Sequence, residues 1–191
     1  MRSVSTPGGA PNLVQANLAP RSNQEWLGPP SADTAAALAS GVATSVAVPV
    51  EIGDVISKVT VLVGATAAGV PTNAFAAVAS GLAIPALLAQ STSQGAAAIP
   101  ASTAVVFTLT AAVRVTNVNA PNGYLYVSVV VAATTVPSLA TVSVPAAVGY
   151  KAFPNSPLFL AATHGSALST TAPATIAAPV TVSAVPIVYL T

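Results

Sequence analysis

Few residues of this chain could do chemistry, and the single histidine is the first of them. His164 stands in the run Thr163-His164-Gly165-Ser166. A nucleophilic triad needs a base beside its nucleophile and a carboxylate that orients the base. Adjacent His-Gly-Ser lacks that spacing, and the chain has no Gly-x-Ser-x-Gly turn. The pattern favours a turn histidine bonded to backbone, and it predicts that the protein is not an enzyme.

Two carboxylates form the next candidate site. Glu51 and Asp54 flank Gly53 in the run PVEIGD. Paired carboxylates can carry out acid–base chemistry or bind calcium, but two of them supply few ligands unless carbonyls or a neighbouring subunit add more. We therefore expect a solvated turn, with a cation site as the alternative. The chain has no cysteine, phosphate loop or dinucleotide motif, so no cofactor and no metal are expected.

The aromatic residues could bind sugars, because sugar rings stack on aromatic faces. Tyr124 and Tyr126 alternate on one strand, while Tyr150 and Phe153 flank Lys151. An aromatic residue in a β-sandwich more often belongs to the core or to an interface. The pattern therefore favours packing, and a host glycan remains the alternative ligand.

Short alternating segments must position these residues. In the run 103–110, Val105, Phe107 and Leu109 face inward. The predicted core lies on three such runs and consists of Val59, Val61, Val105, Phe107, Leu109, Leu125, Val127 and Val129. In the run 55–64, the odd-numbered residues from Val55 to Val63 share one face. In the run 124–131, the odd-numbered residues from Leu125 to Val131 share one face, and the two tyrosines lie on the other.

Weaker strands and turns complete the pattern. Candidate strands are 42–48, 74–80, 82–90, 141–145, 158–162 and 185–190. Asn122-Gly123 is a turn signal, and the 17 prolines suit strand ends better than helices. Alanine leaves two segments open, because 34–38 could start a helix and 73–78 could form a helical turn. The whole predicts an all-β chain: a single jelly-roll-like antiparallel β-sandwich over residues 36–191.

Residues 1–35 differ and are predicted to form an extended N-terminal arm. The segment is rich in Pro, Gly and Asn and lacks periodicity. We expect a neighbouring subunit to hold it, with an arm folded back on its own domain as the alternative. Deleting residues 1–31 is expected to leave the sandwich folded. The candidate anchors are Leu13, Val14, Leu18, Trp26 and Leu27, with Trp26 as the hot spot.

Composition excludes several partners. Only 5% of the chain is charged while 53% is hydrophobic, and the net charge is +1. The five basic residues are scattered, which predicts no nucleic-acid partner. Apolar runs are too short for a membrane helix, and the start lacks the apolar core of a signal peptide, so neither membrane insertion nor export is expected. A surface poor in charge suits a protein packed against copies of itself, so we expect a homo-oligomer, most simply a trimer.

Several segments resemble the Ala/Thr/Val-rich β-sandwich virion proteins of tailed actinobacterial phages. They are Val46–Val63, Pro71–Ser80, Ala104–Leu109, Tyr124–Leu139 and Thr163–Thr191, within the span 36–191. The resemblance implies a virion structural protein, assembled in the host cytoplasm, with no catalytic residues. Head decoration through contact with the major capsid protein or other virion proteins is the favoured role. A minor tail or tail-fibre protein that binds a host glycan is the alternative.

Overall fold

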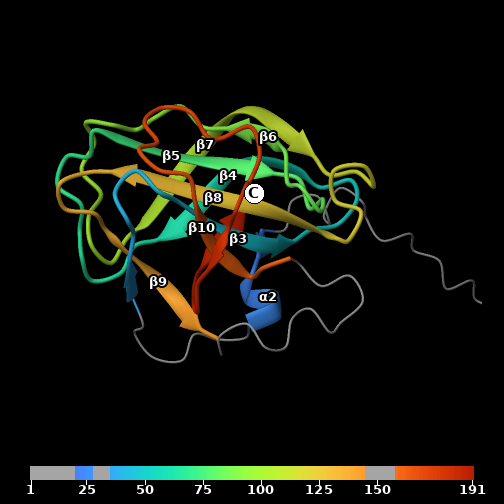
Figure 1. Cartoon of the computed structure of the whole chain (residues 1–191), viewed down its shortest axis with the longest axis horizontal. Coiled ribbons are helices and arrows are strands. Elements are labelled where there is room, and N and C mark those ends of the chain that lie inside the picture. Colours follow the sequence, from blue (N-terminus) through green and yellow to red (C-terminus); the bar gives the residue numbers. More distant parts are fainter. Residues whose placement is uncertain (1–19, 28–34, 145–157) are drawn as a thin grey trace, which may run out of the picture.

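The computed structural model describes residues 20–27, 35–144 and 158–191. Apart from one helical turn, the elements described are strands (Figure 1). In chain order they are β1 (Arg21–Ser22), α2 (Gln24–Leu27), β2 (Ala35–Ala37), β3 (Ala43–Pro49), β4 (Val55–Leu62), β5 (Asn73–Ala79), β6 (Leu87–Gln90), β7 (Ala104–Arg114), β8 (Tyr124–Ala132), β9 (Ser138–Ser143), β10 (Ala161–His164), β11 (Val180–Thr181), β12 (Ala184–Pro186) and β13 (Val188–Leu190).

The largest sheet has six antiparallel strands in the order β11-β10-β3-β8-β5-β6. β8 lies inside it, and all of its residues except Ala132 are buried. Its run of valines and aromatics suits a strand with both faces covered, because branched and ring side chains pack well on a pleated surface. Asn122-Gly123 forms the predicted turn before β8, and Gly123 takes a φ of 75°, where glycine is unstrained.

A four-stranded sheet, β1-β13-β4-β7, packs on one face of the six-stranded sheet. Between them lies the main core, which joins Val59 and Phe107 of one sheet to Leu125 and Val127 of the other. The predicted core is confirmed: seven of its eight members are buried there, and Val105 packs against them half-buried. The fold is thus all-β and consistent with an antiparallel sandwich, while jelly-roll connectivity stays a prediction.

The alternation predicted for 55–64 is wrong at its start. Val59, Val61 and Val63 point into the core, but Val55 is exposed and Ile56 is buried. The cause is a shift of register between Ile56 and Lys58 in the pairing of β4 with β7. A β-bulge of this kind exchanges inward and outward positions on either side of it.

The outer face of the six-stranded sheet is covered by Phe159, which precedes β10, and by the segment 165–179, which follows it (Figure 1). Phe159 and Ile176 pack over Tyr124 and Tyr126, and Ala172 packs over Phe75. Backbone groups of this cover also bond to the strands beneath; the Ala172 N–H, for example, donates to the Gln90 side chain at 2.8 Å. Both faces of the central strands β3, β5 and β8 are therefore buried.

Both segments that the sequence left open between helix and strand are strands. Residues 73–78 belong to β5, and residues 35–37 form β2, which joins β12 and β9 in a small three-stranded sheet. Alanine favours helices in isolation, but tertiary pairing overrides this weak preference. Here Ala35, Ala36 and Ala37 pair with β9 in register.

Candidate interaction surface

Residues 20–27 form a strap that docks on the edge of the four-stranded sheet. β1 pairs with β13 through Arg21–Leu190 and Ser22–Tyr189. The run Ser22-Asn23-Gln24-Glu25 then starts α2 with a capping box. The Glu25 carboxylate accepts a bond from the Ser22 N–H, and the Ser22 hydroxyl accepts one from the Gln24 N–H, each at 3.2 Å. The sequence itself thus sets where the strap turns away from the sheet.

Asn23 clamps the strap to the chain between β12 and β13. Its amide nitrogen donates to the Pro186 carbonyl at 2.6 Å, and its amide oxygen accepts from the Val188 N–H at 3.0 Å. The side chain is buried, so both bonds are shielded from water. Tyr189 and Gln24 add a side-chain hydrogen bond, and Leu27 packs against the main core.

Arg21 ties the strap to the β3–β4 loop by two ion pairs. Its guanidinium lies 2.8 Å from a carboxylate oxygen of Asp54 and 2.8 Å from one of Glu51. The hydrogen bond to Asp54 raises the pKa of Arg21 above its usual value, and burial opposes this effect. The Asp54 side chain is 6% exposed while that of Glu51 is 66% exposed. The predicted solvated turn is therefore wrong for Asp54, whose counter-ion is the guanidinium of Arg21.

Three loops lie side by side at the end of the sandwich that the strap reaches; we call this the strap end. They are the β3–β4 loop (50–54), the β5–β6 loop (80–86) and the β7–β8 loop (115–123). Backbone bonds join them: the Gly53 N–H donates to the Val115 carbonyl at 3.0 Å, and the Gly81 N–H donates to the Asn119 carbonyl at 2.8 Å. The loop tips therefore form one continuous surface.

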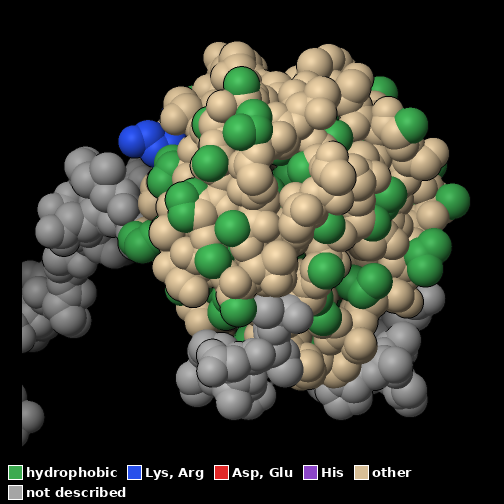
Figure 2. Space-filling view, turned by 90° about the vertical axis from the view of Figure 1, so that its left-hand side faces the viewer, with side chains coloured by type: hydrophobic (Ala, Val, Ile, Leu, Met, Phe, Trp, Pro, Cys, Tyr) green, Lys and Arg blue, Asp and Glu red, His purple; other side chains and the backbone are tan. Residues whose placement is uncertain are grey.

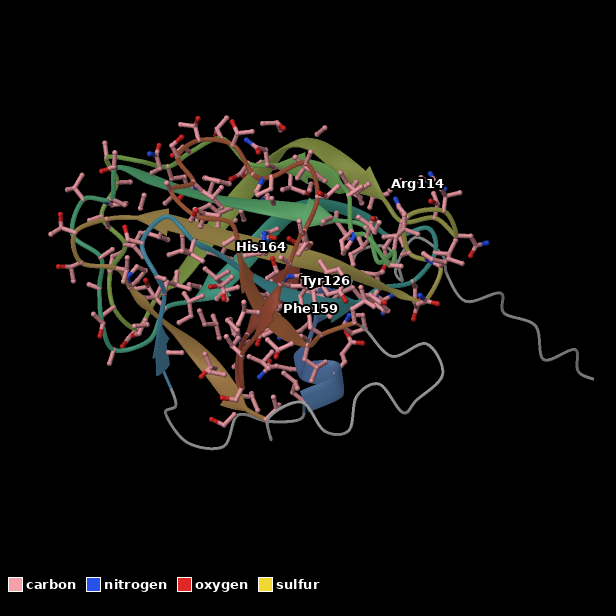
Figure 3. All side chains as sticks on the ribbon, in the orientation of Figure 1. Arg114, Tyr126, Phe159 and His164 are labelled. Carbon is pink, nitrogen blue, oxygen red and sulfur yellow. The ribbon has the colours of Figure 1, made fainter. Side chains whose placement is uncertain are left out.

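Aliphatic side chains stand exposed on these tips. Val118 is 80% exposed, Ile84 70% and Ile52 64%, and Leu82 is exposed as well. The described charged side chains lie on the strap, on the β3–β4 loop, on β4 and at Arg114, where β7 runs into this end (Figure 3). Large apolar groups gathered at one end are typical of a contact surface for another macromolecule.

His164 is buried on β10 and bonds a serine side chain, so the prediction of a turn histidine bonded to backbone is wrong. Its Nε2 lies 2.7 Å from the Ser45 hydroxyl, which lies 2.6 Å from the Ser128 hydroxyl. Burial lowers the pKa of His164, which favours its neutral form. The three side chains come from the adjacent strands β10, β3 and β8, and Figure 3 labels His164 among them. This buried row crosses three neighbouring strands of the six-stranded sheet.

The two strand tyrosines are buried, and this counts against the predicted alternative of a sugar platform there. Tyr126 stacks on Phe159 with ring centroids 4.4 Å apart, and its hydroxyl accepts the Leu158 N–H at 2.9 Å (Figure 3). Burial raises the pKa of Tyr126. Tyr124 meets Tyr126 edge to face. Tyr150, Lys151 and Phe153 lie outside the described residues.

The predicted anchors are only partly placed. Leu13, Val14 and Leu18 lie outside the described residues, as does the side chain of Trp26. Leu27 contacts the core of its own chain. For residues 20–27 the structure thus shows the alternative that the sequence left open, a segment folded back on its own chain.

Sequence reasoning missed the exposed tip residues. Ile52, Ile84 and Val118 stand in the runs EIGD, GLAIP and TNVNAPNG, where glycine, proline and asparagine indicate turns. A branched aliphatic residue in a turn cannot be buried as easily as one in a strand. A branched aliphatic residue within a predicted turn was therefore the sequence signal that could have indicated these exposed side chains.

Comparison with protein-family models gives no match, and comparison with curated proteins gives no significant match. Within the described residues, no helix has the length and apolar character needed to cross a membrane. Nor do three or more potential metal-ligating side chains of His, Cys, Asp or Glu come together in that part of the chain.

Proposed function

We propose that this protein is a structural component of a phage virion, a decoration protein that attaches to the capsid through its strap end. The observation that carries the proposal is the gathering of exposed aliphatic tips at the end where the N-terminal strap docks. The resemblance of residues 36–191 to phage sandwich proteins is the reason for proposing a phage virion as the particle to which the protein attaches. The all-β fold agrees with it.

Contact through aliphatic tips has a simple energetic basis. Burying apolar surface contributes about 25 cal/mol per Å². Side chains such as Ile52, Ile84 and Val118 are exposed in the described chain and would lose their contact with water on docking. Many copies on one shell then add avidity without new contacts.

The test is a binding measurement on particles that lack the protein. Val118→Asp and Ile52→Asp place carboxylates on the strap-end tips, and we expect each to weaken attachment by about tenfold or more, because a charge must be desolvated. Val180→Asp is the matched control: Val180 is 66% exposed but lies on β11, at the edge of the six-stranded sheet. Equal binding by all three variants would contradict the proposal.

Labelling of intact virions then distinguishes a location on the head from a location on the tail. Gold-labelled protein distributed over the head supports decoration. Label confined to the tail would overturn decoration in favour of the minor tail or tail-fibre alternative. The burial of Tyr124 and Tyr126 counts against these two tyrosines as the glycan platform of that alternative.

A further inference from the structure

The end of the sandwich opposite the strap end carries no charge among its described residues; we call it the neutral end. It is formed by the loops 38–42, 63–72, 91–103 and 133–137. Their exposed residues are alanines, threonines, serines, glycine, proline and one large aliphatic residue, Val70. Figure 2 looks at this end, and it shows hydrophobic groups spread over a tan surface with no acidic or histidine side chain in view. A single basic group appears, at the rim.

The neutral end is held in shape by bonds between its loops. Ala68 and Ile99 exchange two backbone hydrogen bonds, at 3.0 and 3.2 Å, across the loops 63–72 and 91–103. The Ala96 N–H donates to the Pro71 carbonyl at 3.0 Å, and the Thr66 N–H donates to the Ser138 hydroxyl at 3.0 Å. A surface fixed in this way loses little conformational entropy when it is covered.

The backbone of the neutral end also holds strained residues. Ala96 has a φ of 73° and Ser102 a φ of 54°, which side chains with a Cβ rarely adopt. Both stand in the loop 91–103. Strain of this kind persists where surrounding contacts fix the conformation.

A hollow and a projecting side chain adjoin each other on this surface. The hollow is shallow and wide open to solvent, and it is lined by Val70, Pro71, Thr72, Ser93, Gly95 and Ala96. Val70 stands at it and is 69% exposed. Val70 belongs to the lining of the hollow, so a twofold pair of copies would set the exposed valine of each copy against the hollow of the other.

We propose that the neutral end is a self-association surface, whose occupant is the neutral end of a second copy of this chain. Two uncharged surfaces meet without like-charge repulsion and without desolvating an ion. Their small side chains lose little rotamer freedom on contact. The inference goes beyond the proposed attachment to a particle, because it concerns the other end of the molecule and holds for the isolated protein.

Sedimentation of the purified full chain over a range of concentrations tests the proposal. We expect wild-type protein to form an oligomer whose mass changes little with salt. Val70→Asp and Ala97→Arg each put a charge on an exposed residue of the neutral end, and each should weaken association by about tenfold or more. Val118→Asp is the control, with the same change at the strap end on a residue that is 80% exposed.

The two proposals fail separately. Val118→Asp should lose particle binding and keep the oligomer, and Val70→Asp should lose the oligomer. A wild-type chain that stays monomeric at high concentration overturns self-association. So does an oligomer that survives both neutral-end substitutions, or one that Val118→Asp disrupts equally. Neither result bears on attachment through the strap end.

Discussion

Polar side chains buried in this sandwich make specific bonds, and Ser45 shows how. Its hydroxyl joins Ser128 on one side and His164 on the other, at the interface between sheet and cover. Strand periodicity alone puts Ser128 on the face of the tyrosines. It could not predict burial of that face, because the covering segment is distant in sequence and shows no regular period. The prediction for His164 was therefore wrong, whereas Ser45 and Ser128 lie in strands as predicted.

His164 should make stability depend on pH. Burial depresses its pKa in the folded state, so below about pH 6.5, the usual histidine value, the unfolded chain takes up a proton that the folded chain resists. Stability is then highest above that pH and falls as the pH drops through it. We expect unfolding measured in urea to show this loss between neutral and mildly acidic pH.

His164→Gln keeps a hydrogen-bonding side chain but cannot titrate. Because the chain has one histidine and no cysteine, the substitution removes the side chain that ordinarily titrates in this range. The variant's stability should be nearly flat from pH 7 to about 5.5. If wild type and variant change in parallel, His164 does not couple folding to protonation.

At the scale of elements, small side chains let the layers approach closely. β5 is built largely of alanines, and all of its residues after Asn73 are buried. Composition left this segment open between helix and strand, because alanine carries no branched or aromatic signal for a strand. The strands with valine alternation, β7 and β8, were predictable because period two is strong there. The bulge in β4 was not, because it depends on its pairing with β7.

Two glycines on the neutral end give a matched test of loop packing. A Cβ on Gly95 would overlap the backbone carbonyl of Thr72, whereas a Cβ on Gly69 would meet nothing within 4 Å. Gly95→Ala should therefore destabilise the fold by about 1–3 kcal/mol. Gly69→Ala should leave stability within about 0.5 kcal/mol of wild type. Thermal unfolding of both variants checks this, and equal stabilities would mean that the loop 91–103 can shift freely.

At the scale of the whole molecule, the strap changes where the N-terminal segment can be cut. The sequence predicted an arm up to residue 35 that could be removed through residue 31 without harm. Residues 20–27, however, supply the counter-ion of Asp54 and the clamp of Asn23. A chain that starts after Arg21 therefore leaves the buried Asp54 carboxylate without its counter-ion. The arm's composition could not show this, because two strand residues and one helical turn are too short for periodicity to reveal.

Two truncations isolate the strap's contribution. Deleting residues 1–27 should lower the free energy of unfolding by about 3–5 kcal/mol relative to deleting residues 1–19, since breaking a buried ion pair leaves a charge uncompensated. Denaturant titration of the two truncated chains gives the difference directly. Two chains of equal stability would show that β1 and the ion pairs contribute nothing net.

The strap also determines how a mechanical force applied to the chain before Arg21 is transmitted to the sandwich. Arg21 and Ser22 lie antiparallel to β13, so a load directed along β1 acts on both backbone pairs, the Asn23 amide bonds and the Arg21 ion pairs together. Bonds loaded in parallel share the force, whereas bonds opened in sequence break one at a time. The load then passes from β13 to β4, in the middle of the sheet. We therefore expect the strap to resist a load along β1 more strongly than a load that peels it away from β13 one bond at a time.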